Sequence, residues 1–206
     1  MDKTERIRLK SLAKEQIKGS IGTMFLILLA VYVLVFAASW VTSFAGGVGG
    51  YIIGPALGIG IVMIYLNMAK GVKPHFSDVF NGFDLFSKSL LLQLLTEIFV
   101  FLWSLLFIVP GIIKSIAYSA APYILAENPQ KNVREILKES ENLMMGHKKD
   151  YFILTMSFLP WIFLSALTFG IGLIYVVPYM DMTMTNFYLS IKPVETEQYF
   201  YEEKVN

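Results

Sequence analysis

The sequence places three ionisable residues, Glu97, Lys114 and Asp181, inside long apolar stretches. A charged side chain at the middle of a bilayer costs about 3 kcal/mol even on translocon-based scales, so residues of this kind are functional candidates by default. Counted at about 1.5 Å per helical residue, the Glu97 and Asp181 carboxyls lie near the midplane of their predicted spans. These two carboxyls are therefore the first candidates for chemistry within the membrane.

Each carboxyl belongs to a polar stripe at near-helical spacing. Gln93 precedes Glu97 by one helical turn, and Thr185 and Asn186 follow Asp181 by about one turn. We expect both stripes to face the interior of a helical bundle. Two interpretations follow. The stripes form a path for protons or cations, or they form hydrogen bonds between neighbouring helices as neutral acids, which is the interpretation we favour.

Lys114 is predicted to lie near a membrane surface rather than at the midplane. It follows a predicted turn at Pro110 and Gly111 by one helical turn, and its depth differs from that of Glu97 by about 15 Å. That separation exceeds the reach of a lysine side chain, which argues against a salt bridge between the two. We expect Lys114 to extend to the outer membrane surface as an anchor.

A second anchor is predicted on the cytoplasmic side, at His147, Lys148 and Lys149. Gly146 is a predicted helix C-cap, and basic side chains that follow it are favourable both for that helix end and for anionic lipid. Neither His147 nor His75 has a metal-ligating neighbour at useful spacing, and the chain contains no cysteine. We therefore predict no catalytic residues, no cofactor and no metal site.

The composition predicts a single membrane domain over residues 1–206. Hydrophobic residues make up 55% of the chain and charged residues 16%, whereas soluble domains carry about 25% charged residues. Apolar runs recur at the length of about 20 residues that a helix needs to cross a bilayer. The predicted fold is an all-α, polytopic membrane bundle of about six transmembrane helices in three hairpins, with spans at residues 20–44, 51–69, 89–109, 112–126, 151–169 and 171–191.

The third and fourth spans come from one uninterrupted run, residues 89–126. A continuous helix of that length would be about 57 Å long, nearly two hydrocarbon cores. Pro110 and Gly111 favour a turn that divides the run into a hairpin. The return segment, residues 112–126, is short for a span, so whether it crosses fully or re-enters remains open at this point.

The distribution of basic residues predicts that both termini are cytoplasmic. If residues 89–126 cross an even number of times, all of the 17 Lys and Arg residues except Lys114 lie on one side of the membrane. Short cytoplasmic loops characteristically hold this excess of positive charge. The predicted orientation is therefore N-in and C-in.

Each predicted hairpin follows a segment with an apolar stripe at helical spacing, at residues 3–18, 75–87 and 131–146. Ile17, Phe83 and Ile136 are examples of the apolar residues in these stripes. We expect the three segments to lie as amphipathic helices in the cytoplasmic membrane interface.

Glycines recur at every fourth position around the start of the second span, at Gly50, Gly54 and Gly58. Small residues at this spacing allow two helices to approach closely, because they remove side-chain bulk from the shared surface. We interpret the three glycines as packing residues rather than as part of a ligand site.

Several longer stretches resemble one bacterial family. They are "RLKSLAKEQIKGSIG", "FSDVFNGF", "LWSLLFIVPGIIKSIAYSAAPYILAENP" and "ESENLMMGHKKDYFILTMSFLPWIFLSALTFGIGLIYVVPY". Together they are similar to the integral-membrane family called domain of unknown function 975, and the resemblance covers nearly the whole chain. It implies a multi-span protein of the bacterial cytoplasmic membrane and carries over no known active site.

Two functions are therefore expected from different classes. The first is a non-enzymatic membrane protein that acts through the lipid bilayer, other membrane proteins or a second copy of itself, in assembly, self-protection or lipid organisation. The alternative is a small transporter, or a proton- or cation-coupled carrier, that uses Glu97 and Asp181. The net charge of +1 indicates no nucleic-acid partner.

Overall fold

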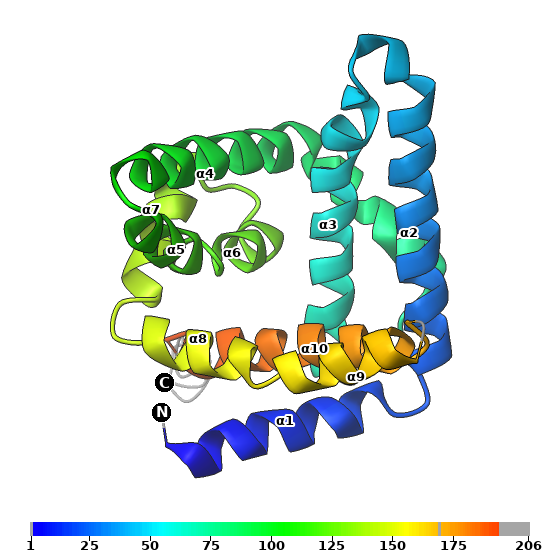
Figure 1. Cartoon of the computed structure of the whole chain (residues 1–206), viewed down its shortest axis with the longest axis vertical. Coiled ribbons are helices and arrows are strands. Elements are labelled where there is room, and N and C mark those ends of the chain that lie inside the picture. Colours follow the sequence, from blue (N-terminus) through cyan, green and yellow to red (C-terminus); the bar gives the residue numbers. More distant parts are fainter. Residues whose placement is uncertain (1, 169, 194–206) are drawn as a thin grey trace, which may run out of the picture.

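The computed structural model describes residues 2–168 and 170–193, and these form helices joined by short turns. This confirms the predicted all-α fold. Figure 1 shows the arrangement of the helices. In chain order they are α1 (Lys3–Ile17), α2 (Ile21–Val41), η1 (Ser43–Ala45), α3 (Val48–Ala69), η2 (Phe76–Leu85), α4 (Phe86–Leu106), α5 (Ile108–Ala117), α6 (Ala121–Glu127), α7 (Val133–Leu143), α8 (Lys148–Met156), α9 (Leu159–Leu167) and α10 (Leu173–Ile191).

Five helical segments in the described residues are long and apolar enough to cross a membrane. They are Ile21–Val41, Val48–Ala69, Phe76–Leu105, Ile108–Glu127 and Lys148–Leu167. The predicted sixth span, residues 171–191, corresponds to α10, which is not among the five. Residue 169, at the end of the predicted fifth span, lies outside the described residues. Residues 1 and 194–206, at the two ends of the predicted single domain, also lie outside them.

A short turn joins α2 and α3, which pack against each other. Gly46 and Gly47 have positive φ angles of 81° and 72° and reverse the chain, a conformation that glycine adopts without steric cost. Gly49 and Gly50 already belong to α3, so the predicted start of this span at residue 51 was too late. A Cβ atom at Gly50 would lie 2.2 Å from the Ser39 Oγ, which shows that this glycine allows α2 and α3 to pack closely.

The run of residues 89–126 does reverse, but the predicted turn position was wrong. The chain turns at Phe107, whose backbone is extended, and Pro110 and Gly111 lie in the first turn of α5. Proline is tolerated there because the first amides of a helix have no intrahelical acceptor. A Cβ atom at Gly111 would lie 2.0 Å from the Ser104 Oγ, so this glycine serves the close packing of α5 on α4.

The return segment, residues 112–126, is not one helix. The chain breaks between α5 and α6, and Pro122 lies at the start of α6. The fifth predicted span is divided in the same way, because Pro160 lies at the start of α9. Two further prolines, Pro55 and Pro178, lie inside α3 and α10. Two of these prolines therefore lie at the start of a new helix, and the other two lie inside a continuous helix.

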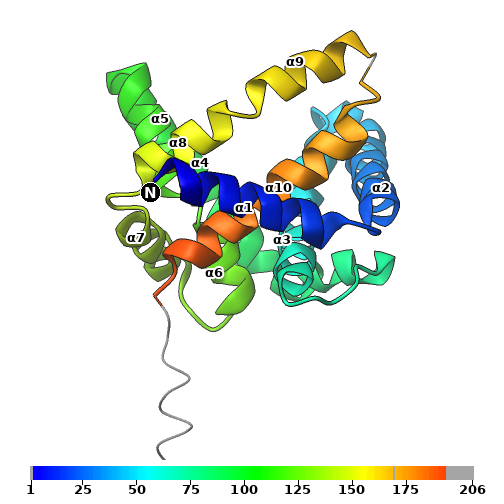
Figure 2. The same cartoon turned by 90° about the horizontal axis from the view of Figure 1, so that it is seen from below.

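The helices cross one another steeply. Figure 1 shows α2 and α3 upright while α1, α8, α9 and α10 run across their lower end. Figure 2, seen from below, shows α1 beside α10, with which it packs along much of its length. Nearly all residues of α10 between Tyr179 and Tyr188 are buried, so this helix forms the centre of the fold.

Two of the three amphipathic segments turn their apolar stripes toward protein rather than toward lipid. Ile17 on α1 and Ile136 on α7 are both 0% exposed and belong to the core. The stripes of α1 and α7 are covered by α10 and by the α4–α6 region. In η2, by contrast, Val79 is buried while Phe80 and Phe83 stay exposed.

Candidate functional site

Glu97 lies on α4 and is exposed, rather than facing the bundle interior as predicted. Its carboxylate accepts a hydrogen bond from the Gln93 Nε2 atom at 2.9 Å, as the polar stripe indicated. Its other oxygen accepts a hydrogen bond from the hydroxyl of Tyr51, on α3. The sequence analysis missed Tyr51, because nothing in its local sequence indicates a contact with α4.

Asp181 lies on α10 and is partly buried. Its carboxylate accepts a hydrogen bond from the Tyr65 hydroxyl at 3.2 Å, and Tyr65 is itself only 2% exposed on α3. Beyond it on α10, the Tyr188 ring stacks on that of Tyr123, with centroids 4.9 Å apart. No local pattern in the sequence indicates Tyr65 as a partner of Asp181, because the two residues lie on different helices.

The two predicted polar stripes have separate partners. Glu97 is bound by Tyr51 and Asp181 by Tyr65, and these tyrosines are fourteen residues apart on α3, about 21 Å along a helix axis. Asn186 donates from its Nδ2 atom to the Gln16 side chain of α1 at 2.7 Å. The structure therefore describes two carboxyl–tyrosine pairs near opposite ends of α3, not one site with two carboxyls.

Thr185, in the same polar stripe as Asp181, donates to the backbone rather than to a carboxylate. Its hydroxyl donates to the Asp181 carbonyl oxygen at 2.9 Å, one turn earlier on α10. Back-bonding of this kind satisfies a hydroxyl donor within an apolar helix. Thr185 is 0% exposed, so it supports the packing around Asp181.

Lys114 is not an anchor that extends away from the protein, so that prediction was wrong. Its Nζ atom lies 2.6 Å from the Glu141 Oε1 atom of α7, and its side chain is 18% exposed. The ammonium also lies 5.3 Å from the centre of the Trp103 ring, a cation–π distance. The cause is the reversal at Phe107, which brings α5 alongside α7. Lys114 therefore joins three helices.

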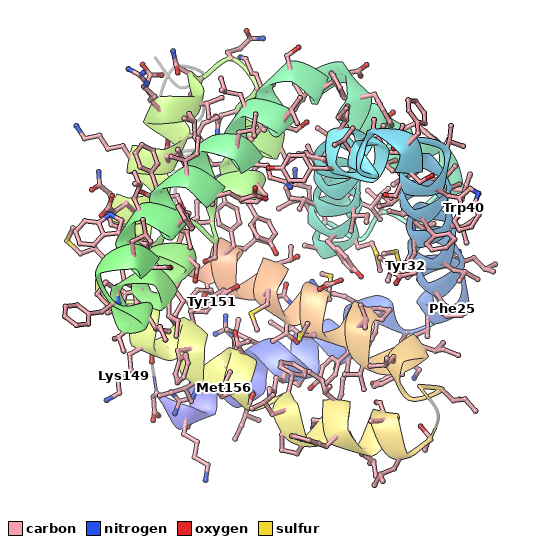
Figure 3. All side chains as sticks on the ribbon, turned by 45° about the horizontal axis from the view of Figure 1, so that its top comes forward. Phe25, Tyr32, Trp40, Lys149, Tyr151 and Met156 are labelled. Atoms are coloured by element: carbon pink, nitrogen blue, oxygen red, sulfur yellow. The ribbon has the colours of Figure 1, made fainter. Side chains whose placement is uncertain are left out.

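His147, Lys148 and Lys149 lie at the start of α8 rather than at the end of the preceding helix. His147 is the residue before α8, and the two lysines occupy its first turn together with Asp150. The predicted interaction of the lysines with a helix C-terminus was therefore wrong, although Gly146 does have a positive φ of 83° as expected. Figure 3 shows Lys149 at the edge of the molecule, where it is exposed.

No group of three or more His, Asp or Glu side chains in the described residues is placed to hold a metal ion. Around the two candidate carboxyls the structure brings together a carboxylate with a tyrosine and an amide at Glu97, and a carboxylate with a tyrosine at Asp181. Such groups can bind a cation or a hydrogen-bond donor. They do not include a nucleophile paired with a base.

Apolar helices of membrane-spanning length that carry a few hydrogen-bonded polar residues define the class of multi-pass helical membrane proteins. Within that class the chain belongs to the family described as Protein of unknown function (DUF975), which matches residues 1–117 and 105–195. The resemblance noted in the sequence is thereby confirmed. No curated protein and no solved structure matches the chain, so the roles of individual residues rest on the geometry described above.

Proposed function

We propose that the protein is a non-enzymatic component of the bacterial cytoplasmic membrane that acts by binding another membrane protein through α2. The supporting feature is an outer aromatic stripe on α2, formed by Tyr32, Phe36 and Trp40. These side chains are 74%, 62% and 72% exposed, and their spacing of four residues places them on one helix face. Figure 3 shows Trp40 pointing away from the other helices.

Tyr32 is the single observation that favours a protein partner over lipid. It lies in the middle of α2, where a membrane-spanning helix meets hydrocarbon rather than headgroups. Within the described part of the chain its hydroxyl has no hydrogen-bond partner, and hydrocarbon offers none. A partner helix with an acceptor would satisfy the hydroxyl, and aromatic residues are enriched at the centres of protein interfaces.

Site-specific photo-crosslinking in bacterial membranes tests this proposal. A photoreactive residue at Phe36 should form an adduct of defined mass with another protein, and the adduct should disappear in the Tyr32→Leu, Trp40→Leu double variant. The same residue at Phe163, an exposed aromatic of α9, is the matched control and should give lipid adducts. Lipid adducts alone at both positions would show that α2 has no protein partner.

The proposal includes the N-in, C-in orientation with six crossings, which the absence of natural cysteines makes easy to test. Single cysteines introduced at Phe44 and Phe107, in the turns after α2 and α4, should react with an impermeant maleimide added to whole cells. Cysteines at Lys70 and Lys131 should react only after lysis. The opposite pattern would invert the orientation, and reaction of all four in whole cells would contradict the crossing number.

A second candidate is a proton- or cation-coupled carrier, and the Asp181 pair supports it. A carboxylate held by a buried tyrosine between α3 and α10 is the kind of group that proton pathways use. Purified protein in liposomes should then conduct protons or cations, and Asp181→Asn and Glu97→Gln should abolish the flux. Unchanged flux in both variants would exclude a carrier that uses these carboxyls.

A further inference from the structure

In the described residues, a partly open cavity of about 420 Å³ lies between α3, α4 and the segment around Tyr118 and Pro122. This volume falls within the range of about 300–1,000 Å³ that small-molecule sites occupy. Leu92 and Val62 form part of an apolar wall, and Gln93 and Glu97 supply polar groups. Apolar walls with a few placed polar groups are characteristic of ligand sites.

Two glycines leave this cavity open. A Cβ atom at Gly54 or at Gly58 would have no neighbour within 4 Å outside its own helix backbone, whereas one at Gly50 would lie 2.2 Å from the Ser39 Oγ. The three glycines interpreted from the sequence as packing residues therefore have different roles. Gly50 packs on α2, and Gly54 and Gly58 line the cavity. Glycine inside a helix is less favourable than alanine, and no close contact in the described residues requires it at these two positions.

The polar end of the cavity carries a carboxyl group in an ordered position. The Glu97 carboxylate accepts from Gln93 on one oxygen and from Tyr51 on the other, which orients it at the cavity wall. No Lys, Arg or His side chain lines the cavity in the part of the chain that is described. The carboxyl oxygens of this site are therefore available to accept from a cationic donor, and its walls are complementary to an apolar body.

We propose that this cavity binds a small hydrophobic amine, with the ammonium group on the Glu97 carboxylate and the apolar body against Gly54, Gly58 and Leu92. An ammonium group can donate to carboxylate lone pairs that Gln93 and Tyr51 leave unused. The apolar body reaches the cavity from the surface of α4, on which Glu97 is exposed. This site is separate from the aromatic stripe of α2 and does not depend on the partner proposed for that stripe.

Equilibrium binding of radiolabelled n-decylamine to the full chain in lipid nanodiscs tests the proposal, after subtraction of uptake by empty nanodiscs. The protein should bind the amine saturably, and unlabelled n-decanol should compete at least about tenfold more weakly because it lacks the charge. Gly58→Leu should reduce the affinity about tenfold or more by filling the cavity, and Glu97→Gln should do the same by removing its charge.

Gly22→Leu is the matched control, since Gly22 is also a helical glycine with nothing within 4 Å of an added Cβ, but it lies on α2 away from the cavity. Its affinity should equal that of the unmodified protein. The proposal is overturned if the unmodified protein shows no saturable binding, if Gly58→Leu binds as well as Gly22→Leu, or if decanol competes as well as decylamine. The measurement involves neither flux nor a protein partner, so its outcome is distinct from those of the functions proposed above.

Discussion

The two faces of α3 use glycine in opposite ways. On the packed face, a Cβ atom at Gly49 would lie 2.3 Å from the Ala38 carbonyl oxygen, and one at Gly60 would lie 1.9 Å from that of Val79. On the open face, Gly54 and Gly58 meet no atom of another helix within 4 Å. A glycine pattern in the sequence therefore shows where side-chain bulk is missing. It does not show whether a helix or a cavity occupies the space.

The strongest test of this contrast is Gly60→Ala. The new methyl group would overlap the backbone of η2, which cannot move aside as a side chain can, so we expect a loss of about 3 kcal/mol or more in the free energy of unfolding. Reversible unfolding in mixed micelles measures the effect. Gly82→Ala should match it, because its Cβ would lie 1.9 Å from the Ala56 carbonyl oxygen. A loss below about 1 kcal/mol would contradict the close packing of α3 on η2.

Removing the carboxyl group from the buried carboxyl–tyrosine pair should cost more stability than removing it from the exposed pair. Asp181→Ala leaves the buried Tyr65 hydroxyl without an acceptor, and we expect it to lower the free energy of unfolding by about 1–2 kcal/mol. Glu97→Ala should cost less than about 1 kcal/mol, because Tyr51 is exposed. Equal losses, measured under identical conditions, would remove the distinction between a packed and an open face.

The Lys114–Glu141 ion pair lies away from α3, so its coupling energy gives an independent value with which to compare the stability changes on α3. Its two side chains are 18% and 36% exposed, so solvent screens the pair only in part. A double-mutant cycle with Lys114→Met and Glu141→Gln should give a coupling energy of about 1 kcal/mol. A coupling energy near zero would show that α5 and α7 are held together by apolar packing and the Ser140 hydrogen bond to the Ala117 carbonyl.

Gly58→Ala should produce the smallest change, and in the opposite direction. The added methyl group meets open space and removes backbone freedom from the unfolded chain, so we expect stabilisation by about 0.5–1 kcal/mol. Thermal unfolding compared with that of Gly60→Ala checks this sign. Destabilisation would mean that the open face of α3 is in close contact with another helix.

The sequence predicted the helices better than their contacts. Apolar runs and turn glycines located α2 and α3 to within a few residues, because these signals are local. The turn at Phe107 was missed, since Pro110 is a strong turn residue that also suits the first turn of a helix. At the site, Gln93 was predicted because it shares a helix with Glu97, and Tyr51 was not, because it lies on another helix.

The sequence by itself determined the class of this protein, its all-α content, its family and the carboxyls worth studying, because composition, hydropathy and short motifs are properties of the chain alone. Only the tertiary structure decided which tyrosine binds each carboxyl, that Lys114 pairs with Glu141, and that Gly54 and Gly58 line a cavity. These features depend on how helices cross. Crossing is set by the packing of surfaces distant in sequence, which no local pattern encodes.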